Sequence, residues 1–417
     1  MRTAFTPAQL ADPHLAEAES ALRACVHCGI CTATCPTYVL LGDERDGPRG
    51  RIVMMQKMLE AGGAPSPETV THVDRCLSCL GCRTACPSGV DYARLVDAAR
   101  AHIETHHTRS VDERLTRWFI KHVLARPALA KTGVVLAKMF APVAKRLPGR
   151  LGAMARTALK AGAATAHVTN VTTQTSVALM PGCVQQALAP SIDAAIQRVL
   201  GRRGIGTVAL DGCCGALAHH LGDAGEARTR AKAIIERFEA LGVESVTIGA
   251  TGCAAHLLDY PHLFAGDAAW EPRAKAFAAK LRDFSTLTAP GAAGQQNIRV
   301  AWQAPCSMQN GTRNAADGRA LLVAAGFDVS DIPEGHLCCG SAGSYSLLQP
   351  DLAGALRARK LGNIARTAPE VIATANIGCL THLSGTDAPP VVHLAELIDW
   401  AEGGPVPQAL EDARRAR

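Results

Sequence analysis

Short apolar runs alternate with longer amphipathic stretches through the second half of the chain, and this pattern occurs twice. Each copy begins with an apolar run that ends at a Gly or Pro turn, as a buried strand does: SVALMPGC and IRVAWQAPC. Stretches of helical periodicity closed by glycine follow: SIDAAIQRVLGRRG and ADGRALLVAAG. The alternation continues through the strand-like GTVALDGCCG and FDVSDIPEGHLCCG, the helix-like RTRAKAIIERFEALG and PDLAGALRARKLGNIAR, and the strand-like ESVTIGATGC and EVIATANIGC. This order predicts a parallel sheet in each copy, because parallel neighbours require a crossover.

Cysteines mark corresponding positions in the two copies of this repeat. These cysteines follow the predicted strands, and corresponding cysteines of the two copies are 123 to 126 residues apart. The last cysteine of each copy is followed three residues later by a histidine. The carboxyl ends of parallel strands form the edge where ligands bind, so we expect distant thiols to converge there. The expected groups are Cys183, Cys213, Cys214 and Cys253 with His256, and Cys306, Cys338, Cys339 and Cys379 with His382. Both groups are candidate metal centres, and packing thiols or redox-active thiols are the alternatives.

Eight further cysteines form two runs within the first hundred residues, CVHCGICTATCP and CLSCLGCRTACP. In each run three cysteines fall within seven residues and a fourth precedes a proline. Three such thiolates can surround one iron–sulfur cubane, and the fourth reaches the other cluster in two-cluster ferredoxins. On that rule one [4Fe-4S] cluster is held by Cys25, Cys28, Cys31 and Cys86, and the other by Cys76, Cys79, Cys82 and Cys35. Zinc is the alternative, but tetrahedral zinc sites combine two separated CxxC pairs rather than a triple run.

The segment between the two runs predicts a helical setting for them. It contains RIVMMQKMLEAGG, in which Ile52, Met55 and Leu59 recur at helical spacing. We interpret this Met-rich face as core rather than as a cofactor site. His27, between two predicted ligands, is interpreted as a modulator of cluster polarity or as an exposed residue. Two adjacent cubanes in such a domain would pass single electrons across the protein.

Positive charge is concentrated between the two cysteine-bearing halves. The chain has a net charge of +6, and the stretch from Arg109 to Lys160 holds twelve Lys and Arg against two acids. Regularly spaced cations alternate there with large apolar residues, which predicts helices broken near Pro127, Pro142 and Pro148. Such helices fit an anionic membrane surface or a partner, or form a solvated linker. No nucleic-acid motif accompanies them and aromatic residues are sparse, so nucleic acid is not an expected partner.

Composition narrows the class of protein. With 48% hydrophobic and 19% charged residues the chain is globular rather than disordered, and no apolar stretch of about 18 residues predicts a spanning helix. The N-terminal segment carries acids and lacks a continuous apolar core, so we do not expect a signal peptide. In the reducing compartment that this implies, sixteen cysteines favour metal or redox chemistry over disulfides. The sequence has no GxGxxG or GxxxxGK[ST] loop for flavin or nucleotide, and His219 and His220 are expected at the surface.

Four segments of the chain, taken in order, resemble the iron–sulfur subunit of glycolate oxidase: LRACVHCGICTATCPTYVLLGDERDGPRGRI, DRCLSCLGCRTACPSGV, HLCCGSAGSYSLLQPDLA and TANIGCLTHL. Similar layouts occur in iron–sulfur subunits of lactate and anaerobic glycerol-3-phosphate dehydrogenases and in heterodisulfide reductase subunits. The resemblance implies a bacterial complex that oxidises glycolate to glyoxylate, with FAD on separate subunits and this subunit passing electrons towards a membrane quinone. In the heterodisulfide reductase relatives each cysteine-rich domain ends in CxxC, whereas His256 or His382 takes the last position here.

Together these observations predict a chain of fold class α plus α/β. We expect a helical ferredoxin-like domain with two cubanes over 1–100, a basic helical linker over 101–172, and cysteine-rich α/β domains over 173–290 and 291–417. The predicted function is electron transfer within a glycolate dehydrogenase, in the cytoplasm and peripheral on the inner face of the inner membrane. The alternatives are a subunit acting with a D-lactate or glycerol 3-phosphate dehydrogenase, and a zinc-bearing interaction module.

Overall fold

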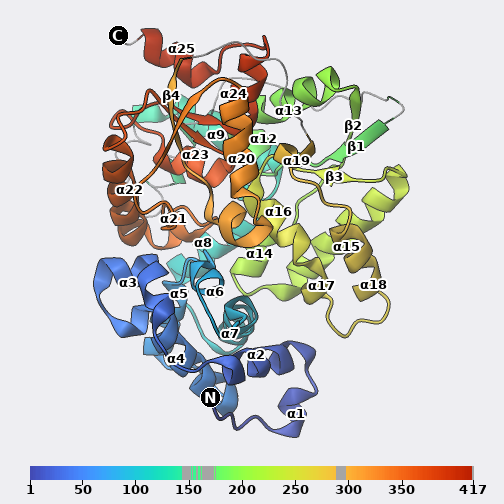
Figure 1. The fold of residues 1–417 in the computed structure, drawn as a ribbon. Coiled ribbons are helices and arrows are strands. Elements are labelled where there is room, and N and C mark those ends of the chain that lie inside the picture. Colours follow the sequence, from blue (N-terminus) through green and yellow to red (C-terminus); the bar gives the residue numbers. More distant parts are fainter. Residues whose placement is uncertain are drawn as a thin grey trace.

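The computed structural model describes residues 1–142, 152, 154–155, 158–159, 161, 173, 175–287 and 297–415. Figure 1 shows the helices of the first hundred residues (blue) gathered at one end of the molecule. The second half of the chain (green to red) forms two parallel sheets with helices around them at the other end. The predicted combination of a helical region with two α/β repeats is confirmed.

Short helices build the N-terminal region, and five of them begin with proline. Proline suits the first turn because the N–H that it lacks would have no partner there. The elements are α1 Pro7–Leu10, α2 Pro13–Ala24, η1 Ile30–Thr34, α3 Pro36–Leu41, η2 Glu44–Asp46, α4 Pro48–Ala61, α5 Pro67–Asp74, α6 Gly81–Thr84 and α7 Tyr92–His106. Ile52, Met55 and Leu59 of α4 lie in the apolar core of this region, so the Met-rich face is core, as predicted.

Two helices and a π-helical turn form the described part of the basic stretch: α8 Val111–Phe119, η3 Ile120–Leu124 and α9 Pro127–Met139. The break predicted at Pro127 is observed, and Pro142 follows the end of α9. Pro148 lies outside the described residues. None of the helices that the structure describes is both long enough and apolar enough to span a membrane.

Part of the positive charge of this stretch is neutralised inside the protein. Arg109 and Arg117 are buried, and both pair with Asp74 and Glu113. Lys121 pairs with an aspartate of the first α/β repeat at 2.8 Å. These cations, on α8 and directly before and after it, therefore fix this helix to its neighbours, which the sequence pattern alone does not predict.

A three-stranded parallel sheet in the order β2-β1-β3 forms the first α/β repeat. Its elements are β1 Thr175–Leu179, α12 Gln185–Leu188, α13 Ser191–Arg202, β2 Ile205–Ala209, α14 Ala216–His220, α15 Ala224–Leu241, β3 Val246–Thr247, α16 Thr251–Leu258, α17 Tyr260–Leu263, α18 Glu271–Ala278 and α19 Phe284–Leu287. The predicted strands and helices are all present, although β3 is only two residues long.

The second α/β repeat has the same strand order with one added strand, β5-β4-β6-β7, again parallel. Its elements are β4 Arg299–Trp302, η4 Ser307–Thr312, α20 Ala315–Ala324, β5 Asp328–Asp331, α21 Tyr345–Leu348, α22 Pro350–Ala365, β6 Val371–Thr374, α23 Ile377–Leu383, β7 Val391–His393, α24 Leu394–Ala401 and α25 Gln408–Arg415. The added strand lies beside β6, so β4 and β6 are the inner strands of the sheet.

The two α/β repeats pack against each other through α13 and α24. Ile196 and Ile398 lie in one apolar cluster that contains side chains from both sheets. Arg198 and Arg202 of α13 pair with Asp399 of α24, whose side chain is 1% exposed. A shared core and ion pairs to one buried carboxylate therefore hold the repeats in a fixed relation, which matters for the thiols at their edges.

Candidate metal centres

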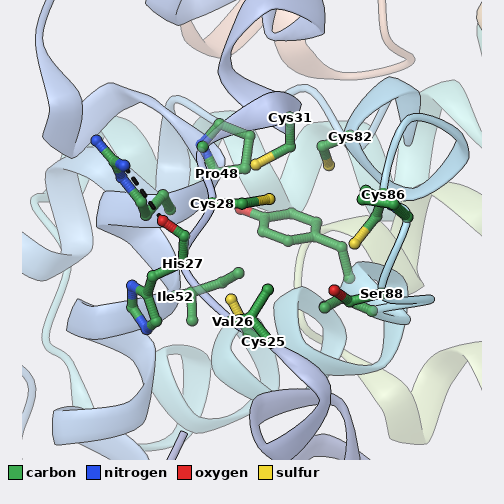
Figure 2. Close-up of a pocket in the computed structure, with 15 residues that line it drawn as sticks. Cys25, Val26, His27, Cys28, Cys31, Pro48, Ile52, Cys82, Cys86 and Ser88 are labelled. Carbon is green, nitrogen blue, oxygen red and sulfur yellow. Dashed lines mark hydrogen bonds between the residues drawn. The ribbon is translucent and has the colours of Figure 1, made fainter.

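Two neighbouring pockets collect the eight cysteines of the N-terminal region. The first pocket is lined by Cys25, Cys28, Cys31, Cys82 and Cys86, whose side chains surround one space in Figure 2. The second pocket is lined by Cys35, Cys76, Cys79 and Cys82. Cys82, Pro48 and Tyr92 belong to the walls of both, so the two pockets are adjacent. Each pocket thus combines cysteines of one run with the last cysteine of the other run.

The backbone of each cysteine run enters the left-handed region twice, at corresponding positions. Positive φ occurs at His27 (57°) and Gly29 (82°) in the first run, and at Ser78 (49°) and Leu80 (58°) in the second. This conformation costs a non-glycine residue about 1–2 kcal/mol. These turns direct three thiols of a run towards one point, which is the arrangement that a shared ligand needs. The backbone strain is therefore found where the ligand would bind.

The first pocket opens to the surface. Cys28 is exposed, and the neighbouring Val26 and Ile30 are 68% and 54% exposed. Burial raises the pKa of the Cys31 thiol to about 11, so this thiol favours its neutral form until a metal supplies positive charge. Soft sulfur donors around one space suit an iron–sulfur cluster. A cluster bound there would be accessible from the surface at Cys28.

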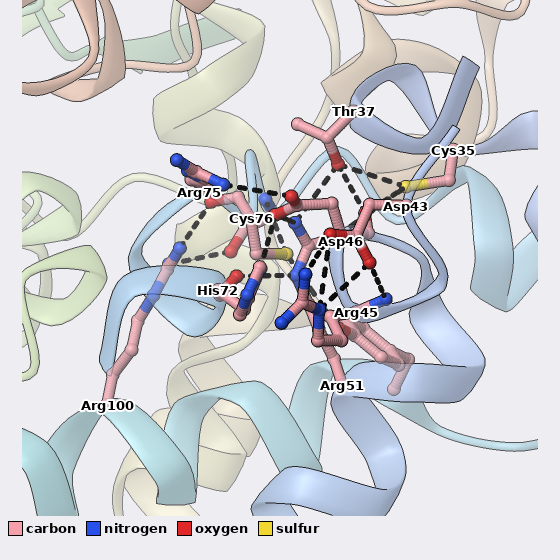
Figure 3. A network of polar contacts seen from close by, with 12 residues as sticks. Cys35, Thr37, Asp43, Arg45, Asp46, Arg51, His72, Arg75, Cys76 and Arg100 are labelled. Atoms are coloured by element: carbon pink, nitrogen blue, oxygen red, sulfur yellow. Dashed lines mark hydrogen bonds and ion pairs between the residues drawn. The ribbon is translucent and has the colours of Figure 1, made fainter. Parts of the chain in front are cut away.

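A buried arginine, Arg51, is part of the wall of the second pocket, and Figure 3 shows the polar contacts around it. The guanidinium of Arg51 donates to the carbonyl of His72 (Nε to O, 2.6 Å), to Thr37 Oγ1 (from Nη2, 3.0 Å) and to Asp46 Oδ1 (from Nη2, 3.3 Å). The side chains of Arg51 and Asp46 are each 1% exposed. Arg51 Nη1 lies 3.7 Å from Cys35 Sγ, so a fixed positive charge faces this sulfur.

Sulfur atoms of the second pocket receive further donors. The N–H of Ser78 lies 3.5 Å from Cys76 Sγ, and the hydroxyl of Tyr92 lies 3.9 Å from the same sulfur. Such donors stabilise negative charge on a ligating sulfur and raise the reduction potential of an iron–sulfur cluster. Among the described residues, no side chain donates to the four sulfurs that line only the first pocket. The two pockets therefore offer a bound cluster different electrostatic surroundings.

The four cysteines of the first α/β repeat converge, as the sequence predicts. The Sγ atoms of Cys183 and Cys213 are 3.6 Å apart. Cys214 is hydrogen-bonded to both Cys213 and Cys253. Hydrogen bonds with the Cys183 and Cys214 thiols, together with the nearby Arg230, lower the pKa of Cys213 well below the usual range of a thiol. The site can therefore hold a thiolate, which is the form that binds metal.

The four cysteines of the second α/β repeat also converge. The Sγ atoms of Cys306 and Cys338 are 3.8 Å apart, and those of Cys339 and Cys379 are 3.4 Å apart. Three of these thiols are buried and Cys306 is half-buried. Two close pairs at one sheet edge supply enough sulfur for a metal centre, although the same spacing also suits packed thiols.

The histidines that follow the two closing cysteines differ in their contacts. His256 Nε2 forms no hydrogen bond with any described residue, and its ring lies 5.0 Å from that of His219. His382 Nε2 donates to the carbonyl of Ala353 at 3.1 Å. The expectation that His219 and His220 lie at the surface is wrong. His219 is 8% exposed, and burial lowers the pKa of His220 to about 3, because α14 packs against α7.

The second cysteine cluster lies against the second pocket of the N-terminal region. Cys79, Cys306 and Cys338 belong to one apolar cluster of side chains. Asn310 of η4 donates to the carbonyl of Cys79 (2.8 Å) and accepts from the hydroxyl of Thr84 (2.8 Å). The two thiol sites are therefore neighbours, although their cysteines lie more than two hundred residues apart in the chain.

Sequence reasoning does not identify Arg51, Tyr92 or Asn310. Arg51 stands in the first turn of an amphipathic helix, where arginines are ordinarily solvated, and no local pattern separates the buried from the exposed case. The one sequence feature that could have pointed to Arg51 is its place, because it directly precedes the apolar Ile52 in the segment that joins the two cysteine runs. Their roles follow from tertiary contacts.

Comparisons with known proteins match this arrangement. Residues 21–90 match the family described as 4Fe-4S dicluster domain, and residues 177–258 and 300–384 each match the family described as cysteine-rich domain. The chain is 38% identical to the glycolate oxidase iron-sulfur subunit of Escherichia coli (strain K12), over 96% of this chain and 99% of that protein. It is 30% identical to the probable glycolate oxidase iron-sulfur subunit of Bacillus subtilis (strain 168), over 92% and 95%. Lactate utilization protein A of an Exiguobacterium strain is 30% identical over only 54% of this chain.

Proposed function

Because the chain belongs to the family of glycolate oxidase iron–sulfur subunits, we propose that it is the electron-transfer subunit of a complex that oxidises glycolate to glyoxylate. The observation that carries the proposal is the pair of adjacent pockets, each with the four or more cysteines that a four-iron cluster requires. Bound clusters would supply single-electron carriers between FAD on partner subunits and an acceptor. The residues of this chain hold and insulate those carriers, and the partner subunits supply the substrate site.

The ligand sets of this proposal follow the two pockets. One [4Fe-4S] cluster takes Cys25, Cys28, Cys31 and Cys86, and the other takes Cys76, Cys79, Cys82 and Cys35. Cys82 also lines the first pocket, which supports a short separation between the two sets. A short separation is what single-electron transfer through protein requires.

The flavin-bearing partner docks, in this proposal, on the surface around Cys28. This cysteine is the exposed member of the first pocket, and the apolar side chains of Val26 and Ile30 stand exposed on either side of it in sequence. Exposed apolar side chains next to a redox pocket are suited to burial against another protein. An electron donor seated there would lie nearer to the first pocket than to the second.

The acceptor side involves α8 and α9, which we propose as a peripheral contact with the inner face of the inner membrane, where a quinone would accept electrons. Val111, Leu115 and Trp118 of α8 are 78%, 63% and 52% exposed, and Met139 of α9 is 68% exposed. Residues three and four apart share one helix face, so these side chains form an apolar stripe on α8. A stripe of this kind can enter the interfacial layer of a bilayer.

Each cysteine cluster of the α/β repeats is proposed to hold a further metal ion or cluster. The support is convergence: four thiols of each repeat meet at one sheet edge, and Cys213 lies beside the cation Arg230. His256 and His382 remain candidate ligands in this proposal. Since His382 Nε2 donates to a carbonyl, this residue would have to bind metal through Nδ1.

The experiment is substitution of pocket cysteines in the complete complex, purified without oxygen. Cys28→Ser and Cys79→Ser each remove one predicted thiolate ligand, so we expect loss of iron and of most glycolate-dependent reduction of a quinone analogue. Cys35→Ser should perturb the paramagnetic signal of the cluster at Cys76, whereas Cys86→Ser should perturb the other signal. Full activity and unchanged iron content in both of the first two variants would refute the proposal.

A further inference from the structure

A group of metal-ligating side chains lies apart from every cysteine site, where α2 meets α17. His14 and Glu17 stand three residues apart on α2, and His262 belongs to α17. One nitrogen of each histidine ring and one carboxylate oxygen of Glu17 lie within 4.8 Å of one another. Residues three apart share a helix face, so α2 presents two ligand atoms together and α17 supplies a third.

One histidine of the group has a ring nitrogen that contacts the carboxylate of the group. The side chain of His262 is 9% exposed, and its Nδ1 is in contact with Glu17 Oε2. Neither atom forms a hydrogen bond with any other described residue. This nitrogen and this carboxylate oxygen are both ordinary metal ligands, and a cation between them would accept a lone pair from each.

Two arginines lie beside the site, and each has a partner. Arg94 is engaged by Asp259, and it also lies 3.5 Å from Asp91. Arg228 donates through Nε to the carbonyl of Leu263 (2.9 Å), and its Nη2 lies 2.9 Å from His14 Nε2. A guanidinium can only donate, so His14 Nε2 presents a lone pair in this structure. Arg228 therefore occupies a position that a metal ion bound to this nitrogen would take over.

We propose that His14, Glu17 and His262 form a binding site for a divalent transition metal ion. Two imidazoles and one carboxylate are a ligand set that zinc binds, with a water in the fourth position. The side chain of Glu17 is 41% exposed, which leaves the ion a path from solvent.

The site would join the N-terminal region to the first α/β repeat. Helix α2 ends at Ala24, and Cys25 of the first pocket is its C-terminal cap. The Cβ that Gly266 lacks would lie 2.6 Å from Pro13 Cγ, so the start of α2 already packs closely on the segment after α17. A metal ion held by both helices would fix the position of α2, and with it the backbone at Cys25.

The test is zinc binding to the iron-loaded complex, measured with ZnCl2 against a competing chelator. Glu17→Gln and His262→Gln should weaken binding by more than about tenfold. The matched control is Glu19→Gln, the same change on the same helix, which should leave the affinity unchanged. Arg228→Gln should tighten binding, because the guanidinium competes for His14 Nε2. Equal affinity in the unmodified complex, Glu17→Gln and His262→Gln would overturn the proposal.

Zinc X-ray absorption separates this site from the cysteine clusters. The zinc lost in Glu17→Gln should have nitrogen and oxygen neighbours at about 2.0–2.2 Å, whereas thiolate sites have sulfur at about 2.3 Å. Amide hydrogen exchange in α2 should slow when ZnCl2 is added to the unmodified complex and should not change in Glu17→Gln. Since Glu17 is partly exposed, this variant keeps the test valid if His262→Gln fails to fold. A shell of sulfur alone, or exchange that ignores zinc, would contradict the site.

Discussion

At the scale of single residues, the sulfurs of the two N-terminal pockets differ in what faces them. Arg51, the Ser78 N–H and the Tyr92 hydroxyl are directed at sulfurs of the second pocket, whereas Cys28 of the first is open to solvent. A cluster becomes more negative when reduced, so a fixed cation and hydrogen-bond donors favour its reduced state. These residues therefore raise the reduction potential of a cluster in the second pocket.

Removing the hydroxyl of Tyr92 tests this effect with little change of shape. Tyr92→Phe should lower the potential of the second-pocket cluster by about 40 mV, equivalent to ~1 kcal/mol for a one-electron couple. The matched control is Tyr345→Phe, because the Tyr345 hydroxyl is buried and has no hydrogen-bond partner among the described residues. Redox titration followed by paramagnetic resonance measures both. A shift of equal size in the two variants would mean that the hydroxyl contact with Cys76 has no special effect.

Residue identity explains what could be predicted at this scale. A cysteine carries its chemistry wherever it stands, so spacing alone suffices to group the thiols of each run. A charged or imidazole side chain takes its role from burial, which depends on elements far away in the sequence. Arg51 and His219 are both buried by such elements, and for this reason the sequence led to no role for the first and a surface position for the second.

At the scale of elements, the repeat could be predicted because its periodicity is strong and its strands end at Gly or Pro. The order β2-β1-β3 recurs as β5-β4-β6. The added strand β7 could not be predicted, because a strand of three residues carries too little pattern. The π-helical turn η4 could not be predicted either, because it differs from an α-helix only in its hydrogen bonds. The turn η4 matters for the site, because it places Asn310 where its side chain donates to the carbonyl of Cys79.

The exposed face of α8 leads to a prediction about membrane contact. Arg109 and Arg117 form ion pairs inside the protein, so their charges are not available to anionic lipid. We therefore expect apolar side chains to contribute a large part of the free energy of vesicle binding. Leu115→Gln with Trp118→Gln should weaken binding of the complex to anionic vesicles by more than about 100-fold, as expected for ~1.5–3 kcal/mol for each of two buried apolar side chains. Trp118 fluorescence should shift to the blue on binding.

The control for this experiment is Val323→Gln, which changes a 48% exposed apolar residue on α20 of the second α/β repeat. This variant should bind vesicles like the unmodified complex. Binding that high salt abolishes but the double substitution leaves intact would assign the contact to cations instead. Absence of binding under all conditions would favour docking of α8 on a protein partner.

At the scale of the whole molecule, the thiol sites form a series. The first pocket opens at Cys28, shares Cys82 with the second, and the second touches the cysteine cluster of the second α/β repeat through Cys79. The first repeat instead meets the N-terminal region through α14 and α7. Two repeats with equivalent cysteine patterns therefore have unequal positions. Packing of whole domains decides this difference, and a local sequence pattern contains no information about it.

Because the cysteine cluster of the second repeat lies against the second pocket, substitutions of the thiols in the two repeats should have different effects. If both clusters of thiols hold metal, the complex should contain more than the about eight irons of two [4Fe-4S] clusters, or additional zinc. Cys339→Ser with Cys379→Ser should remove part of that surplus and alter the spin relaxation of the cluster at Cys79, because the two centres are neighbours. Cys214→Ser with Cys253→Ser should remove its own share of metal and leave that relaxation unchanged. Metal analysis that returns only the ferredoxin complement would leave both sets as thiols, and equal relaxation changes from the two pairs would contradict the series.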